Sequence, residues 1–439
     1  MVEVLWKVGY WSAAYLLLAL LPLVVAMLGH TPGGRGFWIE FGVGLGIVGF
    51  AMLALQFVTT GRFRWVGKYF GADAKIQFHR ETGILALAFI LAHPIVLLVA
   101  EPRYLEYLNP WSNAPRAVFL SGATIALVLL VVLSLWRLSF GLSYEWWRVT
   151  HGGLALVVIL VGLAHSLQVG HYVTGIGKQA VWVIGAGLPL FLLFHTRIVK
   201  PRRIGRNPYR VMEVRPDCEG VYSLVLEPDG HAGMEFQAGQ FAWLTVGETP
   251  FTLQQHPFSF TSSAAASGRV EFGIKELGDF TATIKDLKPG ARAFVEGPYG
   301  AFMLDPQAQG AVFVIGGIGI TPALSILRTC RDRTDRRPML LIYANTQWEE
   351  IAFREELDDL SKHLELEIVH VLANPPEGWN GEAGFVTPEI LARHLSGRKG
   401  QDLQFFVCGP PPMMDVVERA LVAQGVPHWR LVSERFDLV

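Results

Sequence analysis

The sequence predicts an all-α bundle of six membrane helices, followed by an antiparallel β-barrel and then an α/β domain built on a parallel sheet. Three observations predict this class. Long apolar stretches occur only before about residue 200, and short β-rich runs separated by glycine and proline turns follow as far as about residue 305. From Ala311 onward, apolar strands alternate with helical stretches. We therefore divide the chain into domains at residues 1–200, 201–307 and 308–439.

Six apolar stretches in the first domain come close to the length of about 20 residues that a membrane helix needs. They cover residues 9–29, 37–58, 82–100, 117–136, 152–169 and 180–196. The first stretch is long and lacks a small-residue cleavage site, so we do not expect a signal peptide. We expect a lipid membrane, and no nucleic acid, among the partners of this chain.

Lysine and arginine are distributed unevenly between the two sides of these spans. One side holds Arg35, Arg103, Arg116 and Lys178 only. The other side holds Lys7, Arg62, Arg64, Lys68, Lys75, Arg80, Arg137, Arg148, Arg197, Lys200, Arg202, Arg203 and Arg206. Because basic loops stay in the cytoplasm, we expect both termini and the C-terminal half there. The compact layout favours a multi-pass protein of a bacterial plasma membrane.

Four histidines lie in two of the apolar segments with the same spacing. His79 and His93 are 14 residues apart, and so are His151 and His165. In a helix, 14 residues return a side chain to within roughly 40° of the same face, about 21 Å further along. Paired across two helices, these histidines offer both axial ligands to each of two stacked haem b irons. The alternative is that each histidine hydrogen-bonds a neighbour or lines a cavity.

The orientation places His79 and His151 on the inner side and His93 and His165 on the outer side. His30 and His195 lack partners at the matching spacing, and we interpret both as non-ligands. Arg103, Arg116 and His171 are placed to draw an anionic substrate to the outer side, although solvated loop charges are the preferred explanation.

Three motifs in the predicted barrel suit a flavin nucleotide. His256-Pro257-Phe258-Ser259-Phe260-Thr261-Ser262 offers a rigid proline, aromatic faces for a planar ring, and hydroxyls. Gly278-Asp279-Phe280-Thr281 opens a short helix, and Gly297-Pro298-Tyr299-Gly300 is a glycine-rich turn. Backbone amides at such places suit a pyrophosphate. An ordinary strand and an ordinary β-turn remain alternatives for the first and third motifs.

Two motifs in the last domain suit a dinucleotide. Gly316-Gly317-Ile318-Gly319-Ile320-Thr321-Pro322 lies between an apolar strand and a helix, although its spacing is not the full G-x-G-x-x-G pattern. Cys408-Gly409-Pro410-Pro411-Pro412 ends another apolar strand, which we expect at the same edge of the sheet. A tight strand-to-helix turn and a turn with a buried cysteine are the alternatives.

The order of these motifs, with the histidine pairs first, resembles the ferric reductase and NADPH oxidase superfamily. The resemblance runs from the second span to the C-terminus. The motifs of the C-terminal half also occur in ferredoxin-NADP reductase-type flavoenzymes, and their union with the four histidines makes the resemblance specific. It implies FAD, two b-type haems, and NADPH or NADH as cofactors.

The resemblance also implies a role for each matching residue. His79 and His151 would bind the inner haem, and His93 and His165 the outer haem. The flavin and ribityl would lie against His256, Pro257, Phe258, Ser259 and Thr261, and the diphosphate or adenosine of FAD against Gly278, Asp279, Thr281, Gly297 and Pro298. The nicotinamide dinucleotide would contact Gly316, Gly317, Gly319, Thr321 and Pro322. Cys408, with Gly409 and Pro410, would lie near the nicotinamide, and Phe436 would cover the flavin.

The implied enzyme is an NAD(P)H oxidase or ferric reductase. Electrons would pass from NAD(P)H through FAD and both haems to an outer acceptor, which is O2, giving superoxide, or a ferric chelate. An electron relay to a separate outer redox protein or quinone is the alternative, and a transporter with proton- or metal-carrying histidines is a third reading. A partner protein is therefore compatible with the sequence but not required.

The sequence leaves the choice between NADH and NADPH open. The second expected strand of the last domain ends at residues 343–347, where neither an arginine for a 2′-phosphate nor an acid for the ribose hydroxyls is found. Arg328 and Arg331 would contribute only if they were not ordinary exposed helix residues. The acceptor, the regulation, the oligomeric state and the redox potentials also stay open.

Overall fold

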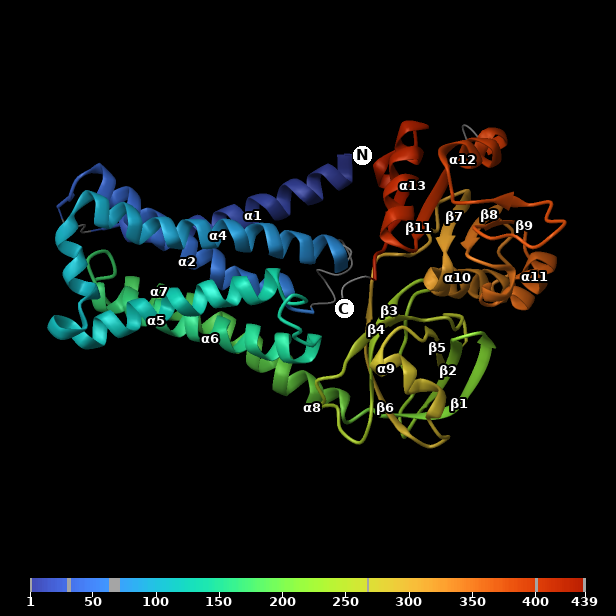
Figure 1. The fold of residues 1–439 in the computed structure, drawn as a ribbon, viewed down its shortest axis with the longest axis horizontal. Coiled ribbons are helices and arrows are strands. Elements are labelled where there is room, and N and C mark those ends of the chain that lie inside the picture. Colours follow the sequence, from blue (N-terminus) through green and yellow to red (C-terminus); the bar gives the residue numbers. More distant parts are fainter. Residues whose placement is uncertain (1, 30–32, 63–71, 267, 399–401, 437–439) are drawn as a thin grey trace. The chain divides into compact units, whose positions relative to one another are not determined.

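The computed structural model describes residues 2–29, 33–62, 72–266, 268–398 and 402–436. His30, Arg64 and Lys68, which entered the predictions above, lie outside the described residues. The chain forms two compact units, which are described separately here. The first contains Met1–Gly61 and Lys75–Val199, and the second contains Arg62–Ala74 and Lys200–Val439 (Figure 1).

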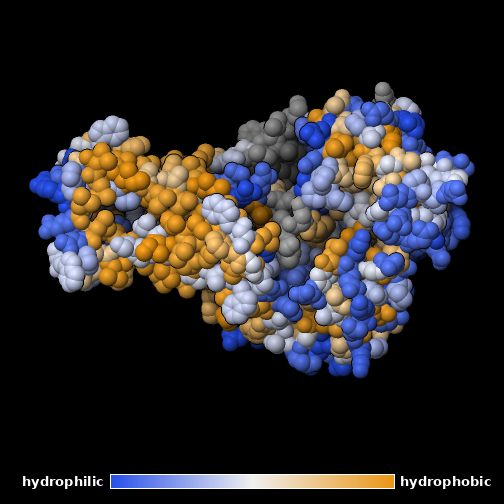
Figure 2. All heavy atoms as spheres, viewed as in Figure 1, coloured by the Kyte–Doolittle hydropathy of each residue, from blue (hydrophilic) through white to orange (hydrophobic). Residues whose placement is uncertain are grey.

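The first unit is helical. Its long helices are α1 (Val2–Met27), α2 (Phe37–Thr60), α4 (Ala72–Ala100), α5 (Pro110–Leu135), α6 (Tyr144–Val169) and α7 (Ile176–Phe194). Among the described residues, six helices are long and apolar enough to cross a membrane. Apolar side chains cover the visible face of these helices, as a lipid-facing surface requires (Figure 2). The protein is therefore an integral, multi-pass membrane protein.

Four of these helices begin well before the apolar stretches that predict them. α1 begins at Val2, α4 at Ala72, α5 at Pro110 and α6 at Tyr144. Polar caps explain two of these starts, because the side chains of Asn109 and Ser143 accept hydrogen bonds from the first turns of α5 and α6. The helices thus extend beyond the apolar stretches, because such a stretch marks the membrane core and not the end of the helix.

The second unit begins with α8 (Lys200–Ile204) and a six-stranded antiparallel sheet. Its strands are β1 (Tyr209–Cys218), β2 (Val221–Pro228), β3 (Phe241–Val246), β4 (His256–Ser259), β5 (Val270–Lys275) and β6 (Arg292–Tyr299), in the order β4-β3-β6-β1-β2-β5. An antiparallel bridge between Phe260 and Phe272 joins the segment after β4 to β5, at the other end of the sheet. Leu224, Leu226 and Ile284 fill its core.

The last domain is a parallel sheet covered by helices on both faces. Its strands are β7 (Gly310–Gly316), β8 (Met339–Asn345), β9 (Leu366–Leu372), β10 (Glu382–Ala383), β11 (Leu403–Cys408) and β12 (Leu431–Ser433), in the order β10-β9-β8-β7-β11-β12. All five pairings are parallel. The strand order therefore reverses at β7, between β8 and β11, and ligands of such sheets bind where the order reverses.

Two apolar clusters hold the helices on this sheet. α10 (Ile320–Asp332) and α11 (Arg354–His363) contribute Leu324, Leu327 and Leu357 to one cluster. α12 (Pro388–Leu395) and α13 (Pro411–Ala423) contribute Leu391 and Val417 to the other. The clusters cover opposite faces of the sheet (Figure 1). The predicted fold class agrees with this structure: six apolar helices come first, an antiparallel sheet follows, and a helix-covered parallel sheet comes last.

Candidate haem, flavin and dinucleotide sites

The four histidines of the helical unit form two pairs between α4 and α6. The ring centroids of His79 and His151 lie 6.2 Å apart, and those of His93 and His165 lie 6.3 Å apart. Each pair joins the two histidines that the spacing argument matched. Because the two histidines on each helix are 14 residues apart, the two pairs occupy different depths of the bundle.

The separation within each pair fits one metal ion between two imidazoles. With metal–nitrogen bonds of about 2 Å, two rings on opposite sides of an ion have centroids about 6 Å apart. No group of three or more possible metal ligands occurs in the part of the chain that the structure describes. Two protein ligands suffice for a haem iron, since the porphyrin supplies the other four.

Hydrogen-bond partners fix the ring orientation of these histidines. Nδ1 of His93 lies 2.8 Å from the carbonyl oxygen of Gly42. A carbonyl only accepts, so Nδ1 donates the proton and Nε2 keeps a lone pair for a metal. Gly46 makes this approach possible, because a Cβ there would lie 2.7 Å from Nδ1 of His93.

Hydroxyl groups lie beside the histidines of the other pair, His79 and His151. Ser134 donates to the carbonyl of Leu130 at 2.6 Å, so its oxygen can accept from Nδ1 of His151 at 2.9 Å. Thr59 lies 3.4 Å from Nδ1 of His79. The contact with Ser134 leaves Nε2 of His151 as the nitrogen suited to bind metal.

The first flavin motif and the short helix α9 (Asp279–Ala282) come together in the structure. The ring of His256 stacks on Phe280 with centroids 4.4 Å apart, and Phe258 lies 6.2 Å from the same ring. Ser259 is buried, and its hydroxyl has no hydrogen-bond partner within the described residues. A buried hydroxyl without a partner fits a site that a polar ligand completes.

Other hydroxyls of these motifs have local partners. The oxygen of Thr281 accepts from the backbone N–H of Leu277 and Gly278, which caps α9. Thr261 is fully buried and its hydroxyl donates to Glu271 over 3.3 Å. The hydroxyls of Thr261 and Thr281 therefore bond within the protein. The hydroxyl of Ser259 is available to a ligand.

The glycine-rich turn at the end of β6 lies near the C-terminal segment. Phe241 of β3 contacts both Tyr299 and Phe436, and each centroid distance is 5.9 Å. Gly297 packs on β3, where a Cβ would lie 2.9 Å from that of Ala242. The structure thus joins Phe436 to the turn through Phe241.

The two dinucleotide motifs meet at the edge of the parallel sheet where the strand order reverses. β7 and β11 are neighbours, with Ile315 opposite Cys408. A Cβ on Gly319 would lie 2.7 Å from the carbonyl oxygen of Cys408, and one on Gly316 would lie 2.8 Å from Pro410. The first motif therefore needs glycine at both positions to contact the second.

Gly317 has a different role from the glycines on either side. Its φ of +52° lies in the left-handed region, and no atom lies within 4 Å of a Cβ built there. The space on the Cβ side of Gly317 is therefore open, while its carbonyl oxygen accepts a hydrogen bond from the hydroxyl of Tyr343. Thr321 and Pro322 are buried in α10, and the hydroxyl of Thr321 donates to the carbonyl of Ile318.

Arg328 is not the exposed helix residue that we expected by default. Its side chain is 11% exposed and forms ion pairs with Glu271 at 3.1 Å and Glu356 at 2.6 Å. It also donates to the carbonyl of Thr261, so it joins α10 to the flavin motif. Arg331 pairs with the adjacent Asp332. The guanidinium of Arg328 is therefore already bound in a contact between the flavin domain and the last domain.

Sequence reasoning missed the acid that precedes the glycine-rich turn. Glu296 is 6% exposed and binds Arg62 and Lys200 at 3.1 and 2.8 Å. Its signal was a charged residue within the otherwise apolar strand 292–299.

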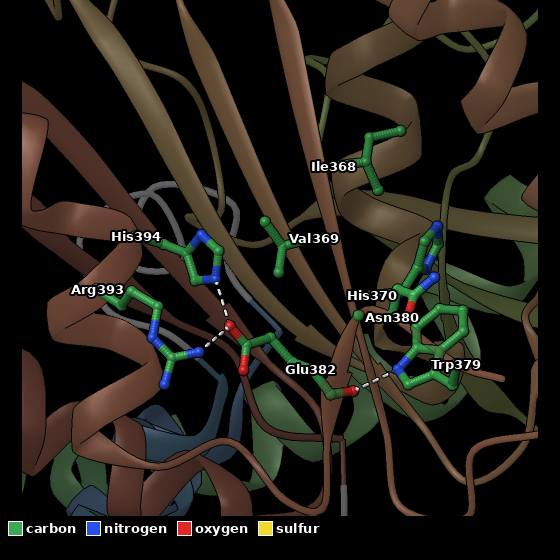
Figure 3. A pocket seen from close by; sticks show the side chains of 9 residues that line it. Ile368, Val369, His370, Trp379, Asn380, Glu382, Arg393 and His394 are labelled. Carbon is green, nitrogen blue, oxygen red and sulfur yellow. Dashed lines mark hydrogen bonds and ion pairs between the residues drawn. The ribbon is translucent and has the colours of Figure 1, made fainter.

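A cavity of about 370 Å³ lies elsewhere in the last domain, between β9, β10 and α12 (Figure 3). Glu382 accepts hydrogen bonds there from Arg393 at 2.6 Å and His394 at 2.8 Å. The hydrogen bond from His394 and the charge of Arg393 lower the pKa of Glu382. None of the motifs described above lines this cavity.

Comparison with known proteins identifies each part of the chain. Residues 45–162 match the ferric reductase like transmembrane component, residues 225–303 an FAD-binding domain, and residues 313–419 the oxidoreductase NAD-binding domain. NADH-cytochrome b5 reductase 1 of Neosartorya fischeri is 37% identical over 170 residues, which are 37% of this chain and 55% of that protein. The same enzyme of Meyerozyma guilliermondii is 38% identical over 168 residues, 37% of this chain and 59% of that protein. The chain thus spans little more than half of these curated relatives.

Solved structures resemble only part of the chain. The ferredoxin reductase in carbazole 1,9a-dioxygenase is 26% identical, with 52% of this chain and 69% of that one covered and a TM-score of 0.46. The FAD/NAD binding domain of nitric oxide dioxygenase from Vibrio cholerae is 22% identical, with coverage of 52% and 98% and a TM-score of 0.47.

The membrane helices and the FAD- and NAD-binding domains define a membrane-embedded oxidoreductase. Their combination in one chain is the architecture of the ferric reductase and NADPH oxidase superfamily.

Proposed function

We propose that this protein carries electrons from cytoplasmic NADH or NADPH across the membrane to an acceptor on the outer side. The observation that carries the proposal is the pair of histidine sites in the bundle, with ring centroids 6.2 and 6.3 Å apart. Their presence in one chain with FAD- and NAD-binding domains supports an electron path, because a non-redox transporter needs neither domain.

The residues of the bundle would hold two b-type haems. His79 and His151 bind the inner iron, and His93 and His165 bind the outer iron. Bound FAD and haem supply the chemistry that the side chains lack, since a flavin converts an electron pair into single electrons that haem iron then carries. Gly42 and Ser134 hold the rings of His93 and His151 by their Nδ1 atoms, so that Nε2 points to the metal.

The residues of the second unit would hold the nucleotides. The flavin lies against the motif from His256 to Thr261, where Ser259 offers a buried hydroxyl. The FAD phosphates or adenosine lie near Gly278, Asp279, Thr281, Gly297 and Pro298. Phe436 would cover the flavin and keep water from it when no nicotinamide is bound.

The dinucleotide would bind where β7 and β11 end. Open space on the Cβ side of Gly317 lets a pyrophosphate approach the N-terminus of α10. Cys408, Gly409 and Pro410 form the neighbouring wall, and the close packing of Gly316 and Gly319 on them fixes its position.

The outer acceptor would react without binding iron. An iron held by two histidines would have no open coordination position, so the acceptor would not need to bind the iron. Both O2 and a ferric chelate meet this condition, and so does a separate redox protein or quinone.

Histidine variants test the proposal through haem content. His79→Ala and His93→Ala each remove one axial ligand, so each purified variant should lose about half of the haem absorbance. His195→Ala is the matched control, because His195 lies at the end of a membrane helix outside both pairs. The proposal fails if both ligand variants keep the haem content of the control.

A further inference from the structure

The buried carboxylate of Glu296 forms ion pairs with Arg62 and Lys200. These two residues lie at two of the points where the chain passes from one unit to the other. The chain crosses after Gly61, after Ala74 and after Val199. Arg62 and Lys200 directly follow the first and third crossings. Arg62 Nη1 lies 3.1 Å from Oε2 of Glu296, and Lys200 Nζ lies 2.8 Å from Oε1.

Further contacts hold Arg62 and Lys200 on the flavin domain. The guanidinium of Arg62 lies 3.5 Å from the ring centroid of Trp243 on β3, and Arg62 Nη1 also donates to Gln255. Lys200 Nζ donates to the carbonyl oxygen of Arg62 at 2.9 Å, so the two connections also contact each other. Both side chains are therefore held by several partners on one surface.

The same network includes the glycine-rich turn of the predicted flavin site. The hydroxyl of Tyr299 donates to Oε1 of Glu296 at 2.8 Å and accepts from Lys200 Nζ at 2.8 Å. Tyr299 in turn contacts Phe241, on which Phe436 packs. Glu296 thus has contacts both to the chain crossings and to the turn that follows it.

A buried ion network of this kind contributes more to geometry than to stability. Removing three charges from water is costly, and apolar residues of similar volume often stabilise a fold equally well. Here each oxygen of Glu296 has a cationic partner. The arrangement therefore indicates that the directions of both chain connections matter.

We propose that Glu296 is a positioning residue that fixes where both connections leave the flavin domain and links these points to the flavin site through Tyr299. The inference rests on the proposed electron path from flavin to haem. Loss of the carboxylate should therefore slow the reduction of haem and leave the reduction of flavin by NAD(P)H unchanged.

The test compares Glu296→Gln with Glu227→Gln in the full, cofactor-loaded protein. Glu227 is an exposed acid on β2 of the same sheet, so it provides the same chemical change without the network. In anaerobic rapid mixing with NADPH, we expect flavin bleaching to stay within about twofold in both variants. Haem reduction should slow by more than this in Glu296→Gln alone, because electron transfer between two cofactors depends on the distance between them.

Hydrogen exchange gives a second readout that does not need activity. The backbone amides of Gly205, Arg206 and Asn207 are bonded to carbonyls of α8 and its end, directly after Lys200. Their exchange should be faster in Glu296→Gln than in Glu227→Gln. Equal haem reduction, or equal exchange, in the two variants overturns the inference.

The two proposals fail in different ways. If the unmodified protein shows no NADPH-dependent haem reduction, the electron path is wrong, while the exchange readout still decides whether Glu296 holds the connection. If Glu296→Gln does not fold, Arg62→Gln takes its place, because Arg62 is partly exposed and its loss breaks the same contact. The same two readouts then apply to Arg62→Gln.

Discussion

At the scale of single residues, the partners of the histidines decide which ring nitrogen faces a metal. A carbonyl oxygen at Gly42 and a hydroxyl at Ser134 both engage Nδ1, of His93 and His151. Nε2 of His93 and Nε2 of His151 therefore each keep a lone pair for a metal. Small residues on neighbouring helices, such as Gly46, make room for these contacts.

Glu296 gives a prediction for the pH dependence of stability. Burial favours its neutral form, but the charges of Arg62 and Lys200 and the hydrogen bonds of the network outweigh burial and lower its pKa. A carboxyl with a lowered folded pKa contributes stability that is fully present above the unfolded pKa of about 4.3 and is lost as pH falls through the folded pKa.

We therefore expect wild-type protein to unfold at a higher temperature than Glu296→Gln at pH 7. The difference should shrink as pH falls below about 4.3, where the carboxylate takes up a proton. Thermal unfolding across this pH range, with Glu227→Gln as control, measures the effect. A difference that grows on acidification contradicts the assignment.

Gly319 gives a prediction for packing between the dinucleotide motifs. Its φ is ordinary for any residue, but a Cβ would lie 2.7 Å from the carbonyl oxygen of Cys408. Gly319→Ala should therefore cost about 1–3 kcal/mol and weaken NAD(P)H binding. Gly397→Ala, which meets no atom within 4 Å, should stay within about 0.5 kcal/mol. Thermal unfolding and nucleotide titration measure both variants, and equal behaviour would count against the packing argument.

At the scale of elements, features that depend on a local sequence pattern are predictable from the sequence. Contacts between residues far apart in the sequence are not. Apolar stretches predict all six spans, and the spacing of 14 residues predicts the histidine pairs, because helix periodicity is a local property. Helix starts at Asn109 and Ser143 depend on caps outside those stretches. The contact of Arg62 with Glu296 joins residues 234 positions apart, so no sequence period reveals it.

Arg328 is the element-scale contact with a clear consequence for cofactor choice. Because Glu271 and Glu356 bind its guanidinium, we expect Arg328→Gln to destabilise the second unit by about 3 kcal/mol. The ratio of the affinities for NADH and NADPH should stay unchanged. Arg331→Gln, whose pair is exposed, should change stability by less than about 1 kcal/mol. A selective loss of NADPH binding in Arg328→Gln would contradict this and indicate that Arg328 binds the 2′-phosphate of NADPH.

At the scale of the whole molecule, the electron path requires the second unit to face the cytoplasm, where NAD(P)H is found. The excess of basic residues on one side of the spans predicts this orientation. A fluorescent protein fused after Val439 should therefore fluoresce in cells, and alkaline phosphatase fused there should be inactive. Phosphatase fused within residues 102–108 should be active, and the reverse pattern would overturn the orientation.

The reduction of haem by NADPH without oxygen tests the central claim most directly. The protein is purified in detergent and supplied with FAD and NADPH under anaerobic conditions while the haem spectrum is recorded. Oxygen is then admitted with cytochrome c present, with and without superoxide dismutase. The account predicts reduced haem bands that oxidise again when an outer acceptor is added, and dismutase-sensitive cytochrome c reduction identifies O2 as that acceptor. Reduced haem that persists in air points to a ferric chelate, a redox protein or a quinone instead, and a spectrum without haem bands contradicts the account.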